Sequence, residues 1–165
     1  AHSHSQLLAL PFIPPVLERE LEVLKKEEEC PYCTIIKEEK EDSRLIFENE
    51  ECIAFTPYFS TGPFEVWILP KKHINFLGVC RENLLFALGE ALRSVLNSYK
   101  KLFGDISYNY MFYQLYESPE YHLKLRLLPR ISIFAGFELN IGCYINSVSP
   151  ERAASFLKVK TIDEN

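Results

Sequence analysis

The sequence predicts an α+β domain in which a mainly antiparallel sheet carries one long helix on a face. Two observations predict this class. Several short β-rich runs follow one another along the chain, and one long stretch with helical periodicity, 82–103, separates them into two groups. The chain has 165 residues, 47% of them hydrophobic, so it can bury one sizeable core but has little room for two.

The first part of the chain predicts an extended arm, a helix and three strands. Prolines hold the end of the arm, 1–15, out of helical geometry. Leucines at helical spacing among charges predict a helix over 16–29, at the start of a second region, 16–165. A polar connection follows the second cysteine of "CPYC" up to residue 43. The three β-rich runs are a hairpin, 44–50 with 52–58, and the strand 64–70.

The second part predicts two helices and three strands. The long helix, 82–103, ends at Gly104, a residue suited to helix termination. The second of the next two strands alternates strictly, with leucines on one face and His122, Lys124 and Arg126 on the other. We expect the three strands at 108–116, 121–130 and 142–148. A short helix then follows, with Ser149 as its cap.

Charge, hydropathy and cysteine usage limit the classes of function. The net charge of −5 provides no general basic surface for nucleic acid. No apolar run is long enough to span a bilayer, and the first residues do not resemble a secretory signal. Five cysteines, an odd number, fit a reducing compartment. We therefore expect a cytosolic protein that binds neither nucleic acid nor membranes.

The "CPYC" motif predicts a metal site. Cys30 and Cys33 have the two-residue spacing of a zinc knuckle, and tetrahedral zinc needs two more ligands. His73 and His122 are the only histidines after the first four residues, so the four side chains make a complete set. A redox pair and ordinary buried thiols are the alternatives, although a thioredoxin-like pair would need a βαβ context that the sequence does not predict.

The opening "HSHSQ" places His2, His4 and Gln6 on one side of an extended segment. This arrangement suits nucleophilic catalysis at phosphorus, in which a neutral imidazole attacks and an amide hydrogen-bonds a phosphoryl oxygen. The alternatives are a purification-tag remnant and a plain surface strand, because short motifs often match by chance.

Taken together, the motifs resemble a known family. The segments "HSHSQLLALPFIPP", "CPYC", "FENEECIAFTPYFSTGPFEVWILPKKH" and "LPRISIFAGFELNIGCYINSVSPERAASFL" are similar to the second half of a galactose-1-phosphate uridylyltransferase, in the histidine triad superfamily. The resemblance implies a histidine-triad-like half, preceded by the last active-site strand of a first half. It also implies that His4 is the nucleophile, uridylylated by UDP-glucose, and that Gln6 hydrogen-bonds the transferred group.

The resemblance also implies metal and substrate contacts. His2 matches a zinc ligand of the first half, and Glu20 a carboxylate that some members use, with three histidines, to bind iron. Here Lys124 stands where those members have a further histidine, so we expect zinc at Cys30, Cys33, His73 and His122, with Glu20 near the metal. Phe137 and Glu138 match a segment that recognises the hexose in the partner subunit of a dimer.

The resulting expectation is a transferase of carbohydrate metabolism that exchanges a uridylyl group between UDP-glucose and hexose 1-phosphate. Most of the nucleotide pocket would belong to a missing N-terminal half, so we expect the chain alone to be inactive. Two alternatives stay open. One is a non-catalytic, zinc-stabilised structural or dimerisation module, and the other is a relative that transfers adenylyl groups.

Overall fold

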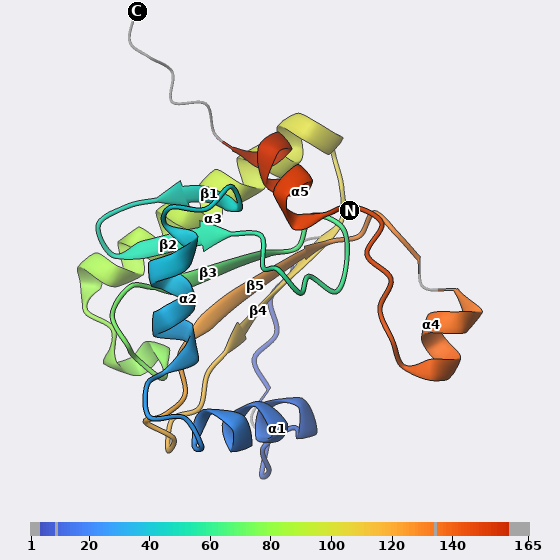
Figure 1. Cartoon of the computed structure of the whole chain (residues 1–165). Coiled ribbons are helices and arrows are strands. Elements are labelled where there is room, and N and C mark those ends of the chain that lie inside the picture. Colours follow the sequence, from blue (N-terminus) through green and yellow to red (C-terminus); the bar gives the residue numbers. More distant parts are fainter. Residues whose placement is uncertain (1–3, 9, 134, 159–165) are drawn as a thin grey trace, which may run out of the picture.

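The computed structural model describes residues 4–8, 10–133 and 135–158. Its centre is a five-stranded sheet in the order β1-β2-β3-β5-β4 (Figure 1). All four pairings are antiparallel, which confirms the predicted fold class. The strands are β1 (Leu45–Glu48), β2 (Cys52–Phe55), β3 (Val66–Pro70), β4 (Tyr108–Tyr113) and β5 (Lys124–Pro129).

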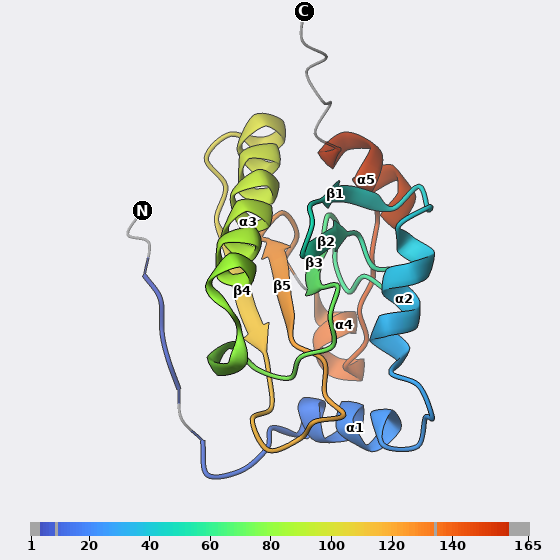
Figure 2. The ribbon, with the colours of Figure 1, turned by 90° about the vertical axis from the view of Figure 1, so that its left-hand side faces the viewer.

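Helices cover both faces of the sheet (Figure 2). One face packs against α3 (Glu82–Phe103) and α5 (Pro150–Leu157), through a core that includes Val95 and Leu125. The other face packs against α1 (Pro15–Leu24) and α2 (Pro31–Glu39), with Trp67 in its core. Because β2 and β3 lie at the centre and are covered on both sides, every residue of these two strands is buried.

Three predicted elements were wrong in position or type. The helix predicted over 16–29 ends at Leu24, which is the last of the buried residues of α1. Helix α2 occupies what the sequence predicted as a polar connection. Its charged residues obscured a pattern in which Tyr32 and Ile36 are buried, and Pro31 at its first turn favours helix initiation.

The predicted strand at 142–148 does not form. A short helix, α4 (Gly136–Ile141), precedes it and ends at Gly142, whose φ of 70° is left-handed and suits glycine. The segment that follows is β-rich in composition, but it pairs with none of the five strands in the described part of the sheet. Composition alone therefore did not make a strand, because a strand also needs a partner.

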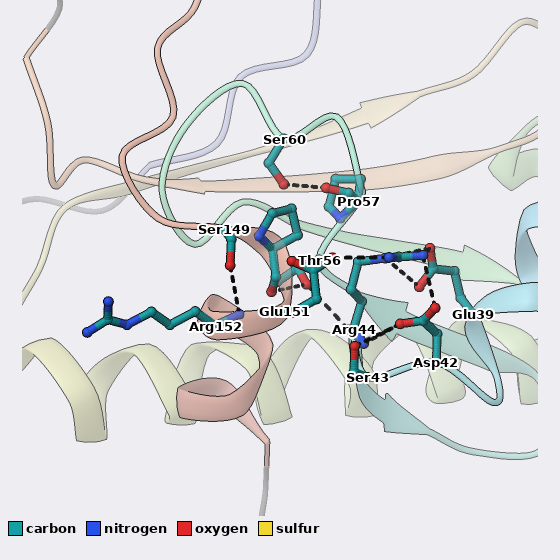
Figure 3. Close-up of polar contacts among 11 residues, drawn as sticks. Glu39, Asp42, Ser43, Arg44, Thr56, Pro57, Ser60, Ser149, Glu151 and Arg152 are labelled. Carbon is teal, nitrogen blue, oxygen red and sulfur yellow. Dashed lines mark hydrogen bonds and ion pairs between the residues drawn. The ribbon is translucent and has the colours of Figure 1, made fainter.

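A polar cluster around Arg44 joins two helices to the start of β1 (Figure 3). The guanidinium donates from Nε to Glu39 Oε1 of α2 over 3.0 Å and from Nη1 to Glu151 Oε1 of α5 over 3.1 Å. Burial raises the pKa of Glu39, and Arg44 opposes that shift. Thr56, fully buried, donates to the Pro150 carbonyl over 2.8 Å. These contacts fix α2 and α5 relative to the sheet.

Within the described residues, no helix combines the length and apolarity needed to cross a bilayer.

A candidate metal centre and its surroundings

The two cysteines of the candidate metal centre stand at the start of α2. Cys30 is the residue before the helix, Pro31 occupies the first turn, and Cys33 donates its N–H to the Cys30 carbonyl over 2.9 Å. This tight turn directs both sulfur atoms to one side. The N-terminal end of α2, which is the positive end of its helix dipole, lies beside them.

The two histidines reach the same place through the pairing of β3 with β5. His73 follows the end of β3, and His122 precedes the start of β5. Because these strands are antiparallel neighbours, the end of β3 and the start of β5 lie at the same end of the sheet. The imidazole rings meet edge to face with centroids 5.0 Å apart. Sheet topology thus joins two residues that are far apart in sequence.

The four predicted ligands form one compact group. Their ligand atoms all lie within 4.8 Å of one another. The Cys30 and Cys33 sulfurs each lie 3.7 Å from His122 Nδ1, and Cys33 Sγ lies 3.6 Å from His73 Nδ1. In tetrahedral zinc, bonds of about 2.3 Å to sulfur and 2.0 Å to nitrogen would separate these atoms by about 3.6 Å. The group can therefore hold a tetrahedral metal ion with little movement.

Both histidines present the nitrogen that a metal needs. His73 Nε2 lies 2.8 Å from the Pro119 carbonyl and His122 Nε2 lies 3.0 Å from the Pro70 carbonyl. A carbonyl only accepts, so each Nε2 carries the proton and each Nδ1 lone pair faces the sulfurs. Burial lowers the pKa of His122 to about 4, which keeps that ring neutral at physiological pH.

The thiols would have to lose protons to bind a metal. Burial, with the neighbouring Cys30, raises the pKa of Cys33 to about 11 in the metal-free protein. A metal ion would supply the positive charge that stabilises the thiolate and would displace the proton. Two imidazole nitrogens share one centre with the two free thiols, and a redox pair would not need these additional ligands. The arrangement favours a metal site over a redox pair.

Glu20 lies in a different cluster. Its carboxylate accepts hydrogen bonds from Tyr32 and, over 2.9 Å, from Tyr121, and it forms an ion pair with Lys124. Lys124 is 4% exposed. Burial lowers the pKa of Lys124, and Glu20 opposes that shift. The candidate ligand Glu20 is therefore held by an ammonium group from β5 and is not one of the four grouped metal ligands.

A second buried charge pair lies on the same face of the sheet. The Nε of Arg126 lies 2.7 Å from Oε1 of Glu65, which is 1% exposed and also accepts from Trp67 Nε1 over 2.8 Å. Sequence reasoning gave Arg126 no role and did not consider Glu65. The alternation of charged residues with leucines along β5 could have indicated this pair. A strand that is covered on both faces also buries its charged residues, and these then need partners of opposite charge.

The two described residues of the predicted catalytic motif lie on the exposed arm. His4 and Gln6 are both exposed, and residues 4–8 form neither a helix nor a strand. Ser5 Oγ lies 3.2 Å from the hydroxyl of Tyr110, on β4, so the arm contacts the edge strand of the sheet. The third residue of the motif, His2, lies outside the described residues. The structure does not bring His4 into the metal cluster.

The predicted hexose-binding residues stand apart from both clusters. Phe137, 57% exposed, and Glu138 lie on α4, which projects away from the sheet (Figure 1). The Glu138 carboxylate accepts from the Ala135 N–H over 2.8 Å and so caps the helix.

Solved structures place the fold in a class. A zinc-bound histidine triad protein from Mycobacterium smegmatis has a TM-score of 0.58 over 79% of this chain and 91% of its own, at 16% identity, and so shares the fold alone. A uridylyltransferase structure has a TM-score of 0.83 at 29% identity, and the match covers 90% of this chain and 51% of that one. The chain therefore has the fold of about half of that uridylyltransferase, and histidine triad proteins share this fold.

Comparison with curated protein sequences identifies enzymes that are similar to this chain. No family model matches the chain. An ADP-glucose phosphorylase from Arabidopsis thaliana is 35% identical over 96% of this chain and 47% of its own length. A galactose-1-phosphate uridylyltransferase from Thermotoga maritima is 28% identical over 98% of this chain and 56% of its own length. The chain is a homologue of both of these enzymes, and it spans about half the length of each.

Proposed function

We propose that this chain is part of a nucleotidyltransferase that acts on a sugar nucleotide through a covalent nucleotidyl-histidine at His4. The observation that carries the proposal is the His-x-His-x-Gln motif in a chain that aligns, over nearly its whole length, with a galactose-1-phosphate uridylyltransferase and an ADP-glucose phosphorylase. An imidazole on an extended segment, with an amide two residues away on the same side, suits attack at phosphorus.

The proposed reaction has two displacements at the α-phosphorus. An imidazole nitrogen of His4 attacks this atom, a phosphorus–nitrogen bond forms, and the bond to the bridging oxygen breaks, so that the hexose 1-phosphate leaves. An acceptor phosphate oxygen then attacks, and the phosphorus–nitrogen bond breaks to regenerate the imidazole. Gln6 would donate its amide N–H to a phosphoryl oxygen and stabilise the charge that develops there.

The catalytic site would need residues that this chain does not contain. Its relatives are about twice as long. The arm contacts β4, an edge strand whose outward positions include the exposed aromatic residues Tyr108, Tyr110 and Phe112. We propose that a first half of the enzyme packs at this edge, surrounds His4 and supplies the partners of His2. A homodimer in which Phe137 and Glu138 contact the hexose in the partner's site is also proposed.

We propose zinc as the metal of the Cys30, Cys33, His73 and His122 site. Two thiolates and two neutral imidazoles in tetrahedral spacing are the donors that zinc prefers. The four residues leave no open position for a substrate, so the ion would be structural and would join α2 to the ends of β3 and β5. Iron is disfavoured because Glu20, the carboxylate that it would need, is already paired with Lys124.

Two transferred groups fit the proposal, a uridylyl group and an adenylyl group. The uridylyl reading follows from the motifs. The ADP-glucose reading is favoured by the 35% identity to the phosphorylase, against 28% for the Thermotoga maritima enzyme. Both donors are therefore compared in the test. A structural or dimerisation module without catalysis is the alternative function.

The test is covalent labelling. The chain is incubated with UDP-glucose or ADP-glucose labelled at the α-phosphorus, alone and with a separately produced N-terminal half of a relative. We expect acid-labile, base-stable label on the protein only with the added half, and none with His4→Gln. Ser5→Ala is the matched control, because it changes the same arm and leaves the imidazole.

The outcomes distinguish the proposed enzyme from the non-catalytic module. Label that persists in the His4→Gln variant would exclude His4 as the nucleophile. Rapid sugar-nucleotide turnover by the chain alone would contradict the proposed need for a first half. Absence of label from both donors, with the added half present and bound, would favour the non-catalytic module.

A further inference from the structure

The ammonium group of Lys124 lies among aromatic rings from three different elements. Its Nζ is 4.5 Å from the ring centroid of Trp67 on β3, 4.7 Å from that of Tyr32 on α2, and 5.1 Å from that of Tyr113 on β4. Each distance is within the range at which a cation is attracted to the face of a ring. Because the side chain of Lys124 is 5% exposed, little water competes with these contacts.

Oxygen atoms complete the surroundings of this ammonium group. Glu20 on α1 provides the negative charge through Oε1, and the Tyr32 hydroxyl lies 2.6 Å from Nζ. The other carboxylate oxygen of Glu20 accepts from Tyr121 over 2.9 Å. Glu20 is thus held in place by neighbours on both sides, and the carboxylate stays aimed at the cation.

We propose that Glu20, Tyr32, Trp67 and Tyr113 form an alkylammonium-binding cage that Lys124 fills as an internal ligand. Three aromatic faces with one carboxylate make up the kind of site by which proteins recognise organic ammonium ions. An ordinary buried ion pair would need one anion and hydrogen bonds only. Here side chains from α1, α2, β3 and β4 converge on one cation, so the cage also holds α1 and α2 against the sheet.

Two residues of the cage border a hollow at the surface. Glu20 and Tyr32 also line an apolar hollow between α1 and α2, together with side chains that include Val23, Ile35 and Phe59. A small cation could therefore enter from that side if the side chain of Lys124 were shortened. The proposal does not depend on nucleotidyl transfer, and it uses none of the four grouped metal ligands.

The experiment replaces the tethered ammonium by a free one. Lys124→Ala removes three methylene groups beyond Cβ and the ammonium group, which corresponds to n-propylammonium. We expect the variant to unfold at lower temperature than the wild type. Propylammonium chloride should then raise its Tm by about 5 to 11 °C near a hundred times Kd, and the Tm should keep rising with the logarithm of its concentration. The same concentration of 1-propanol, in sodium chloride of equal ionic strength, should not.

Two variants serve as controls. Lys72→Ala removes an exposed lysine and should show no response specific to propylammonium. Lys124→Ala combined with Glu20→Gln should lose most of the response, because the cage then lacks its charge. A response to 1-propanol equal to that to propylammonium would show a simple apolar cavity and overturn the proposal.

The test remains decisive if Lys124→Ala does not fold alone. In that case the yield of folded protein after refolding is measured with propylammonium and with 1-propanol. A higher yield with the cation alone supports the cage. Equal yields refute it, and so does a Lys124→Met variant that matches the wild type in Tm, since methionine fills the same space without charge.

Discussion

Replacing Arg44 with methionine should destabilise the fold strongly and in a pH-dependent way. In the wild type, Arg44 donates to Glu39 from Nε over 3.0 Å and from Nη2 over 2.9 Å. The side chain of Glu39 is 5% exposed and that of Arg44 is 17% exposed. The substitution would leave the Glu39 carboxylate buried without a cation, at the end of the helix that begins with the metal ligands (Figure 3).

The expected magnitude follows from this burial. Breaking one side of a buried ion pair costs about 3 to 5 kcal/mol, and the partial exposure of Arg44 favours the lower value, about 3 kcal/mol. For a chain of this size, that loss corresponds to a fall in Tm of about 6 to 12 °C. Lys40→Met is the matched control, because its pair with Glu48 spans 3.5 Å and Lys40 is 41% exposed, so we expect a loss below about 1 kcal/mol.

The sign of the pH dependence separates charge from packing. Burial already raises the pKa of Glu39, and without Arg44 that pKa would rise further. A raised carboxyl pKa means that the penalty is present above the pKa and disappears as the group is protonated at lower pH. The loss in the Arg44→Met variant, measured by urea unfolding, should therefore be smaller at pH 5 than at pH 8. Equal losses at both pH values, or a loss below 1 kcal/mol at pH 8, would refute the reasoning.

Three further outcomes are expected. Tyr99→Phe should cost about 1 to 2 kcal/mol in urea unfolding, since the Tyr99 hydroxyl donates to the Phe64 carbonyl over 2.7 Å in a buried setting; an unchanged midpoint would contradict this. Because the pKa of Cys33 is about 11 without metal, binding must displace its proton. Apparent zinc affinity, measured by chelator competition, should rise at least about tenfold per pH unit between pH 6 and 8, and a flat profile would count against thiolate ligation. Elemental analysis should find about one zinc per chain, lost in Cys30→Ser but kept in Glu20→Gln, whose Glu20 lies outside the metal group. Metal loss in Glu20→Gln would instead place that carboxylate at the ion.

The sequence predicted best those elements in which the spacing of apolar residues matches the face that is buried. The helix over 82–103 has its apolar residues at helical spacing, and the structure gives α3 the same bounds. In β5, leucines alternate with Lys124 and Arg126 because the leucines face the core beneath α3, whereas Lys124 faces the side that α1 covers. Helix α2 was missed because its charged residues hide a short buried face, and the strand expected at 142–148 lacks a partner. Periodicity describes a segment, whereas strand formation depends on a neighbour.

The sequence by itself determined the chemical donors: a tight cysteine pair, two histidines, and an alternating strand that carries Lys124 and Arg126. Only the tertiary structure decided where these groups meet. The antiparallel pairing of β3 with β5 brings His73 and His122 to the two cysteines, and the packing of α1 and α2 over the sheet encloses Lys124 beside Glu20. The physical reason is that residue type and spacing fix local geometry and chemistry, whereas the convergence of distant residues depends on which strands pair and which faces the helices cover.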